Sequence, residues 1–553
     1  MIVTGFHAVR RHQVCKRRGE GIAYMAEYVS RRTTLRNAVL GLFLSLLPPG
    51  ITAQAQEAGG TLRMAQTGFR HLNPAIQSGG GTGVPGAQIF AGLIELDANN
   101  QPQPYLAERW TVSPDALRYT FHLVEGARFH DGTPVTSEDV AFSVATVRQY
   151  HTFGRSTMGP VERVETPDPR TAVFVLNAPH PALLMALAPQ LMPIIPKHVY
   201  STEPILTHPA NLKAIGSGPF RVVEVKPGEL VILERNKDFF RKGRPLLDRI
   251  VSRVVEDPAS LVLQLESGEL DFVPAGVRYR DLNRLKANKN LVVARTRVGL
   301  GAVNYLEFNL RKPPFNDIRV RRAIAHAIDK PTIVKNLHGG WSKVADGPIH
   351  PDTLYASKTV NTYPYDLEKA KKLLDEAGFP VGPNGKRFSV TLDAPPFYPD
   401  GLALVADFLK PQLARIGIDV ERRPTPDFAT WAKRISNYEY DLTMNSAWNY
   451  PDPLIGVHRL YTCANQTKGV IWSNTQGYCN ERADAALAAA TREMDPAKRA
   501  ADYEAWQKII TEDLPFVFTT TEEFYAIYST RVKGVSHNAF SDLQPMDAVY
   551  FAK

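Results

Sequence analysis

The stretch AWNYPDPLIGVHRLYTC, residues 447–463, combines several side chains that can bind a ligand. Trp448 and Tyr450 offer aromatic rings, Asn449 an amide, and Asp452 a carboxylate set between two prolines. Large rings give contact area at little entropic cost, and a few polar groups then orient the ligand. The pattern favours a ligand-contacting loop, with a turn between two buried elements as the alternative.

The remaining sequence offers no convincing catalytic motif. GSGPF at 216–220 does not fit the G-x-S-x-G elbow of a hydrolase. SGGGTG at 78–83 lacks the Lys-Ser/Thr ending of a phosphate loop and is more typical of a flexible turn. His130-Asp131 favours a turn before a capped helix over a catalytic pair. Neither H-E-x-x-H nor C-x-x-C occurs, so we expect a binding protein without a metal site or cofactor.

The first 55 residues have the features of an export signal. SRRTTLR precedes the apolar run AVLGLFLSLL, which is too short to cross a bilayer, and AQA offers a cleavage site before residue 56. The Arg31-Arg32 pair resembles a twin-arginine signal, with an ordinary Sec signal as the alternative. Met25 would be a more usual start. No cysteine follows the run, so we expect a soluble periplasmic protein without a lipid anchor.

The positive charge is concentrated in this leader. The first 55 residues contain eight Lys/Arg and two Glu, so only +3 of the net charge of +9 remains after residue 55. No basic stripe with interleaved aromatic residues occurs elsewhere, and we expect no nucleic-acid partner.

Two of the three cysteines belong to the mature chain. Cys15 lies in the leader, which leaves Cys463 and Cys479. In an oxidising compartment these two are expected to form a disulfide, with two separate buried thiols as the alternative.

The mature chain mixes strand-like and helix-like segments without an internal repeat. Alternating apolar residues predict strands, and apolar residues at helical spacing, such as Val320 and Ile324, predict helices with arginine and histidine on the outer face. Thr136 with Asp139 forms a capping pair. The chain is of the α/β class, and its 553 residues predict more than one lobe. Strands are expected at 117–124 and 171–179, and helices at 136–147, 317–330, 366–378 and 495–513.

Several long motifs occur in a fixed order. PYLAERWTVSPDALRYTFHLVEGARFHDGTPVTSEDVAFS at 104–143 is followed by GSGPFRVVEVKPGELVILERNKDFF, LESGELDFV, LEFNLRKPPFNDIRVRRAIAHAIDK, KAKKLLDEAGF and YCNERADAAL. From about residue 60 to its end, the chain therefore resembles the bacterial extracellular solute-binding proteins of family 5, the dipeptide, oligopeptide and nickel receptors of ABC importers.

The resemblance implies a periplasmic-binding-protein fold (type II, cluster C-like) of two lobes that close about a hinge. It also implies a peptide or small-molecule ligand, permease and ATPase partners from an ABC importer, and a monomeric receptor. The implied division is a signal peptide at 1–55, a first lobe at 56–95, 216–300 and 526–553 with an inserted subdomain at 96–215, and a second lobe at 301–525.

In peptide-binding members of this family, a Trp here is followed after two residues by an Asp that pairs with the peptide's α-amino group. Trp448 matches that Trp, but the run is two residues shorter and Pro451 occupies the place of the Asp. A buried ammonium needs a counter-charge. Two hypotheses remain: Asp452 supplies it from a shifted loop, or the ligand has no free amino terminus.

Other polar and aromatic residues are weaker candidates for ligand contact. They lie near the same stretch, after the first expected strand, or where the chain would cross to the second lobe. The alternative for each is a structural role in the core, in a turn or at the hinge. They are Asn445, Asn449, Tyr450, Asn304, Tyr305, Gln66 and Thr67.

The sequence therefore predicts the substrate-binding subunit of an ABC importer for peptides or peptide-like solutes, without catalysis. A receptor for a sugar, an opine or a metal chelate is the first alternative, favoured by the missing Asp. An exported hydrolase is the second, and it would need a nucleophile, a base and an orienting group that we do not find.

Overall fold

The computed structural model describes residues 59–297, 300–396 and 401–553. The leader, with Arg31, Arg32 and Met25, lies outside these residues. None of the helices within them is long and apolar enough to cross a membrane. Helices and strands alternate along the described chain, which confirms the α/β class.

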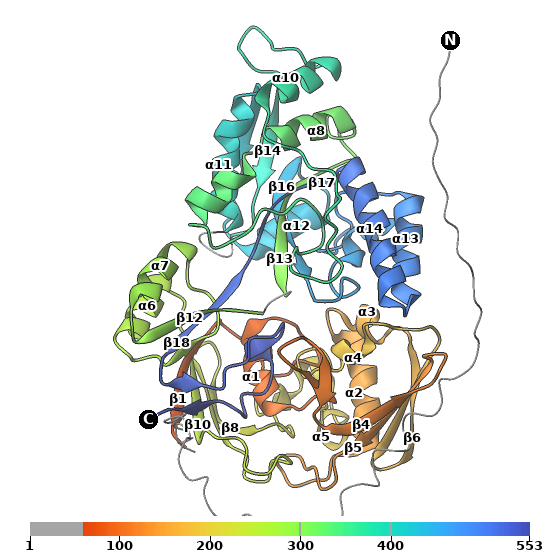
Figure 1. The fold of residues 1–553 in the computed structure, drawn as a ribbon, viewed down its shortest axis with the longest axis vertical. Helices are drawn as coiled ribbons and strands as arrows, with labels where there is room; N and C mark the ends of the chain where they lie inside the picture. The colour runs from red at the N-terminus through yellow and green to blue at the C-terminus, as the bar shows by residue number, and fades with distance from the viewer. Residues whose placement is uncertain (1–58, 298–299, 397–400) are drawn as a thin grey trace, which may run out of the picture. The chain divides into compact units, whose positions relative to one another are not determined.

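The first lobe is built on a mixed seven-stranded sheet (Figure 1). Its strands are, in order, β12 (Leu291–Thr296), β18 (Phe524–Ser529), β11 (Phe272–Val273), β1 (Thr61–Gln66), β10 (Arg249–Val254), β9 (Leu230–Arg235) and β8 (Phe220–Lys226). The central β1 pairs in parallel with β10 and β11. Its Leu62 and Met64 point into the core while Thr61 and Arg63 are exposed, as the two-residue period of a strand requires.

Helices cover this sheet. α6 (Pro258–Glu266) and α7 (Tyr279–Ala287) lie at the β12–β18 end (Figure 1), and leucines of both helices are buried in one cluster with Ile527. α1 (Gly80–Ile89) begins inside SGGGTG, so the predicted flexible turn is wrong there. A Cβ on Gly81 would lie 2.3 Å from the carbonyl oxygen of Gly68, and this close approach explains the glycine.

A four-stranded antiparallel sheet belongs to the predicted inserted segment. Its order is β4 (Ala107–Val112), β5 (Arg118–Leu123), β7 (Thr171–Leu176) and β6 (Val161–Asp168), and β5 and β7 confirm two predicted strands. α2 (Ser137–Tyr150) packs against β6 and β7. The amide of Thr136 donates to Asp139 Oδ2 over 2.8 Å, which confirms the capping pair.

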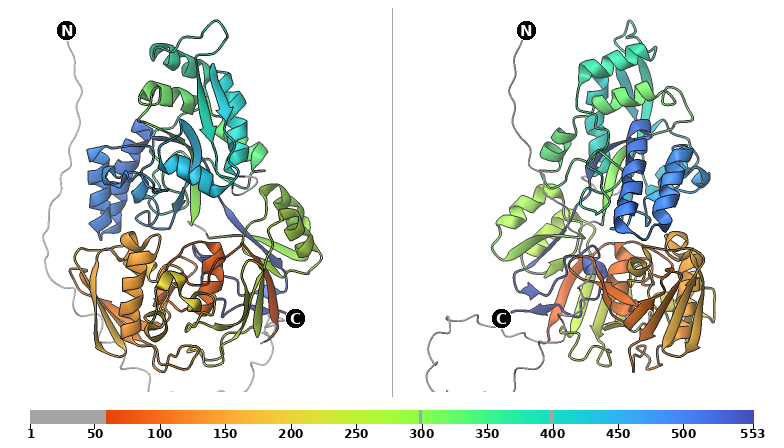
Figure 2. Two further views of the ribbon diagram at one scale, coloured as in Figure 1. Left: turned by 180° about the vertical axis from the view of Figure 1, so that it is seen from behind. Right: turned by 45° about the vertical axis from the view of Figure 1, so that its right-hand side comes forward.

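The second lobe is built on a five-stranded sheet. Its order is β15 (Ile418–Arg422), β14 (Phe388–Asp393), β16 (Leu442–Asn449), β13 (Gly301–Phe308) and β17 (Phe516–Thr521). All of β13 is buried, because it lies between β16 and β17 inside the sheet. The helices of this lobe are α8 (Ile318–His326), α10 (Leu367–Glu376), α11 (Leu402–Ala414), α12 (Phe428–Ser436), α13 (Glu481–Arg492) and α14 (Pro496–Asp513), of which the last two lie side by side (Figure 2).

The predicted helices at 366–378 and 495–513 are confirmed, with Asp366 and Asp495 as caps. Within 317–330 the helix α8 ends at His326, earlier than expected. The expected outer face of α8 is also wrong in part, since Arg321 and His326 are buried. Carbonyl oxygens of the chain replace water around both: Arg321 donates to Leu514 O over 3.0 Å, and His326 Nδ1 lies 2.7 Å from Pro364 O.

Smaller elements complete the described chain. They are β2 (Ile94–Leu96), β3 (Pro102–Pro104), β19 (Val532–Lys533), β20 (Tyr550–Phe551), α3 (Gly154–Met158), α4 (Leu183–Ala186), α5 (Lys197–Tyr200), α9 (Lys330–Thr332), the π turn η3 (Ile333–Leu337), and the 3-10 turns η1 (Ile205–Thr207), η2 (Pro209–Asn211), η4 (His458–Leu460), η5 (Cys463–Asn465) and η6 (Ser541–Leu543).

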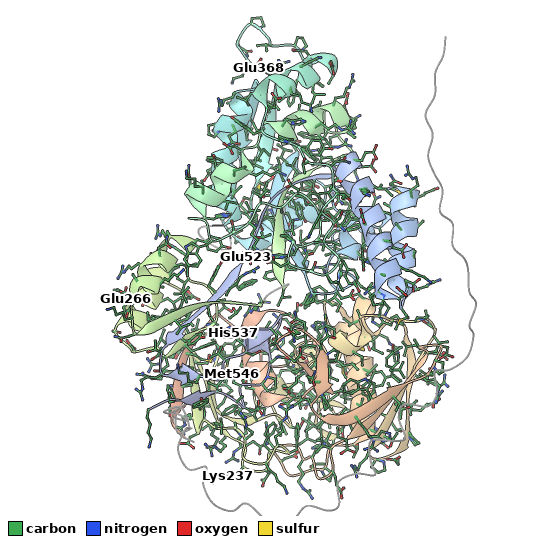
Figure 3. The ribbon with its side chains drawn as sticks, viewed as in Figure 1. Lys237, Glu266, Glu368, Glu523, His537 and Met546 are labelled. Atoms are coloured by element: carbon green, nitrogen blue, oxygen red, sulfur yellow. A yellow bond between two sulfur atoms is a disulfide. The ribbon has the colours of Figure 1, made fainter. Side chains whose placement is uncertain are left out.

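The chain passes between the two large sheets twice, from β12 to β13 and from β17 to β18. The second connection is only Glu522 and Glu523, and Figure 3 labels Glu523 there. Arg295 of β12 donates to Glu523 Oε2 over 2.6 Å and also pairs with Asp352. Strand β12 is thus tied to the connection between β17 and β18.

Candidate functional site

A cavity of about 430 Å³ lies where residues of the two lobes meet. β16 supplies Trp448 from the second lobe, and β18 supplies Phe524 from the first. The remaining lining residues come mainly from α1, the segment before it, and the loops after β1 and β11. They are Gln66, Thr67, Gln77, Ser78, Gly79, Gly80, Gly83, Val84, Thr152, Phe153, Gln190, Pro274, Ala275, Gly276, Arg297, Leu300, Tyr450, Arg459, Trp472 and Leu543.

Aromatic rings form much of the cavity wall. Trp448 stacks on Phe524 with ring centroids 5.6 Å apart and planes at 24°. Tyr450 meets Phe153 edge to face at 5.2 Å. Burial raises the pKa of Tyr450, which keeps its phenol neutral. Together, these rings give a flat or apolar group of a ligand an aromatic surface to pack against.

Four of the candidates predicted from sequence line this cavity: Trp448, Tyr450, Gln66 and Thr67. The side-chain amide of Gln66 is enclosed, and neither its nitrogen nor its oxygen has a hydrogen-bond partner among the described residues. Asn304 lines a smaller cavity of about 90 Å³. The two cavities share Gly276 and Phe524, so they adjoin.

Three other candidates lie in the protein interior and line neither cavity. Asn445 donates to Glu307 Oε2 over 2.9 Å. Tyr305 packs on Phe516, with ring centroids 4.1 Å apart. Asn449 accepts from the amide of His350 over 2.9 Å. Each side chain is held by a neighbour from its own lobe.

The carboxylate of Asp452 is buried and faces Arg499, not the cavity. Arg499 Nη1 lies 2.5 Å from Oδ2, and Nη2 lies 2.8 Å from Oδ1. This bidentate pair uses both carboxylate oxygens. The geometry therefore disagrees with the hypothesis that Asp452 anchors a ligand amino group.

The sequence profile of the bacterial extracellular solute-binding proteins, family 5 Middle, matches residues 101–468. The chain belongs to this family. A Brucella ovis protein, whose name assigns it to peptide binding for an ABC transporter, is 30% identical over 523 residues, covering 90% of this chain and 95% of that protein.

Solved structures agree with the family assignment and with the two-lobed fold. DppA from Helicobacter pylori, in complex with the peptide STSA, superposes with a TM-score of 0.77 at 26% identity, over 90% of this chain and 99% of that one. AgaA from A. tumefacien R10, in complex with agropinic acid, has a TM-score of 0.75 at 27% identity, over 89% and 99%.

This family 5 protein carries three charged side chains near the cavity that sequence reasoning did not single out. Arg297 is bound by Asp542 through contacts of 3.0 and 2.7 Å. Arg459 lines the cavity without a carboxylate partner among the described residues. Glu522 lines the smaller cavity, and burial raises its pKa to about 7 against the opposing charge of Arg297.

The predicted disulfide between Cys463 and Cys479 is present, with an S–S distance of 2.09 Å. The loop that it closes contains Trp472, which lines the cavity and stacks on Phe428 of α12. The covalent link thus restrains one of the cavity walls.

One cluster has the composition of a metal site. Ligand atoms of His350, Asp352 and Glu523 lie within 4.8 Å of one another. Both carboxylates already bind cationic side chains: Arg295 pairs with each, and Lys343 Nζ lies 2.6 Å from Asp352 Oδ1. We therefore interpret the cluster as an ion-pair network beside the lobe connections.

Sequence reasoning missed several lining residues, chiefly Phe153, Gln190, Arg297, Arg459 and Phe524. Arg459 lies within the stretch 447–463, so its position there was an available signal. The other four are far from that stretch in sequence, and only the fold brings them to the cavity.

Proposed function

We propose that this chain is the substrate receptor of an ABC importer and captures peptides or peptide-like solutes in the cavity between its lobes. The observation that carries the proposal is the pair Trp448 and Phe524, one from each lobe, which stack on each other in the lining of a cavity of about 430 Å³. The names of the Brucella relative and of DppA with its bound peptide support the ligand class. The role includes no catalytic step.

Ligand capture would proceed by closure of the lobes about the two chain connections. A ligand that contacts Trp448 and Gln66 together binds the closed form better than an open one, because only closure brings the two lobes to it. Its differential affinity then sets how far the population shifts. The permease, with its ATPase, would recognise the closed receptor.

The proposal includes export and assembly. Residues 1–55 would direct export and be removed, leaving a soluble monomer in the periplasm without a lipid anchor. The lobe division is proposed as above, 56–95, 216–300 and 526–553 with 96–215 inserted, and 301–525, except that Phe524 and Tyr525 are assigned to the first lobe because β18 belongs to its sheet. Trp448, Tyr450, Gln66 and Thr67 are the proposed ligand contacts.

A receptor for a non-peptide solute is the second candidate. It is favoured by the ion pair of Asp452 with Arg499, which leaves no free carboxylate at that point of the loop for a peptide's amino terminus. The structure of AgaA in complex with agropinic acid shows that a protein of similar fold binds this acid.

Native mass spectrometry tests the ligand class. The mature protein is purified from periplasm, weighed intact, and then denatured to release what it holds. A ladder of peptide masses would support the first proposal. A single non-peptide mass would favour the second, and Trp448→Ala should lose the same ligand in both cases. Turnover of peptides or esters by the purified protein would contradict both.

A further inference from the structure

Arg459 is a cation in the cavity wall without an anionic partner. It lies on η4, and its guanidinium carbon is 5.0 Å from the centre of the Phe153 ring. Its Nε is enclosed, with no hydrogen-bond acceptor among the described residues. A buried donor left unpaired is costly, and a buried charge more so. The arrangement therefore points to a partner that arrives from outside the chain.

Three other buried arginines of the described chain have different surroundings. Each has its guanidinium satisfied by carboxylates or carbonyl oxygens of the protein. They are Arg297 with Asp542, Arg499 with Asp452, and Arg321 with the carbonyl oxygens of Phe315, Asp513 and Leu514. Arg459 differs from all three. It lines the cavity, and no Asp or Glu of the described residues pairs with it.

The cavity around Arg459 is rich in hydrogen-bond donors and poor in acids. Its lining, within the described residues, includes neither Asp nor Glu. Gln190 contributes an enclosed amide nitrogen without a partner, and Gln66 an amide with both atoms unpaired. Such a lining suits an anionic, acceptor-rich group.

We propose that Arg459 anchors a carboxylate of the transported solute, and that Gln66 and Gln190 donate further hydrogen bonds to the solute. This inference rests on the proposed receptor function and narrows its substrate class to carboxylate-bearing solutes. The carboxylate is either the C-terminus of a peptide or the acid group of a small organic acid. Two parallel hydrogen bonds from the guanidinium to its oxygens would give both strength and orientation.

The surroundings of Arg459 support this role. Burial lowers the pKa of its guanidinium, and no carboxylate of the described residues opposes this effect. An arginine nevertheless stays charged in a protein. A ligand carboxylate would supply the missing counter-charge, so its binding offsets the desolvation of Arg459.

The first test uses acetate and acetamide, which have similar shapes and differ in charge. Both are titrated into ligand-stripped mature protein while its melting temperature is followed, with chloride balancing the ionic strength. We expect a saturable rise with acetate and none with acetamide. Arg459→Gln should abolish the rise, and Arg253→Gln, which removes an exposed arginine of β10, should retain it. No saturable rise, or a rise that survives Arg459→Gln, overturns the proposal.

The second test separates the sources of the carboxylate. Ligand-stripped protein is offered a tripeptide library as free acids, the same library as C-terminal amides, and a mixture of small organic acids, and captured masses are read by native mass spectrometry. Capture from the free-acid library alone supports a peptide C-terminus, with affinity falling at least about tenfold in Arg459→Gln. Arg459→Lys keeps the positive charge but loses the planar guanidinium that makes two parallel hydrogen bonds, so it should retain part of the affinity.

The two proposals fail in different ways. Capture of organic acids alone, lost in Arg459→Gln, keeps the carboxylate anchor and contradicts peptide transport. Equal capture of free-acid and amidated peptides keeps peptide transport and overturns the anchor. If Arg459→Gln does not fold, the wild-type preference between acids and amides still decides.

Discussion

Asp452 and Arg499 form a buried bidentate ion pair, with contacts of 2.5 and 2.8 Å, between the loop after β16 and helix α14. The guanidinium carbon of Arg499 also lies 4.9 Å from the ring centre of Tyr355 and 5.3 Å from that of Tyr503. Asp452, the acidic residue of the Pro-Asp-Pro turn, thus fixes this turn to helix α14 of the second lobe. Trp448 and Tyr450 line the cavity and can contact a ligand, whereas the carboxylate of Asp452 is already paired.

Asp452→Asn should destabilise the protein without changing ligand affinity. Removing one partner leaves the charge of Arg499 buried and uncompensated, which costs about 3–5 kcal/mol. Urea unfolding measures the loss, and calorimetric titration on the folded fraction measures affinity. Asp419→Asn, which breaks the exposed pair with Lys386, is the matched control and should change stability little. A large loss of affinity in folded Asp452→Asn would instead assign the carboxylate to the ligand.

Trp448→Ala should weaken binding of the co-purified ligand by roughly thirtyfold or more, the effect of losing a central aromatic contact of about 2 kcal/mol. Isothermal titration with the identified ligand measures this. Trp110→Ala, in β4 outside the cavity lining, is the control and should bind as the wild type does. Equal binding by both variants would remove Trp448 from the site.

Glu522→Gln should change the pH dependence of stability. Burial raises the pKa of Glu522 from 4.5 to about 7, so the folded protein holds a proton in this window that the unfolded chain releases. Stability therefore falls as pH rises from about 4.5 to about 7, by up to about 3 kcal/mol. The variant should lack this fall in urea unfolding at several pH values. Glu368→Gln, an exposed residue of α10, should keep it, and parallel curves for all three proteins would contradict the prediction.

Loss of the disulfide should lower the free energy of unfolding. Cys463 and Cys479 are 16 positions apart, and a loop of this size corresponds to about 3 kcal/mol in the chain-entropy account. The variant Cys463→Ser/Cys479→Ser is compared with wild type by urea unfolding, with and without reductant. Reductant should lower the free energy of unfolding of the wild type alone. Equal free energies of unfolding for the two proteins would show that the disulfide does not stabilise the fold.

The leader makes a separate prediction about export. Replacing Arg31 and Arg32 together by lysine should leave the precursor in the cytoplasm if the twin-arginine route is used. Cell fractionation with immunoblotting follows its location. Replacing Arg17 and Arg18 by lysine is the matched control, since these lie ahead of Met25, the more usual start for a signal of this kind. Normal export of both variants would point to the Sec route.

Local signals in the sequence predicted much of the fold. The caps Thr136, Asp366 and Asp495 stand next to the helices that they begin, so the helix starts could be placed from short-range spacing. The outer face of α8 could not, because Arg321 is satisfied by carbonyl oxygens nearly 200 residues further along the chain. An amphipathic pattern indicates which face is apolar, not which polar side chain will find an internal partner.

The sequence by itself predicted the family, the α/β class, several helices and strands, the disulfide and the importance of the stretch around Trp448. Only the tertiary structure decided which polar residues are free for a ligand. Asp452 and Arg459 stand seven positions apart, yet one is paired with Arg499 across 47 residues of sequence and the other faces the cavity unpaired. Local propensity and spacing act between near neighbours, whereas the pairing of a buried charge depends on what the whole fold brings within a few ångströms of it.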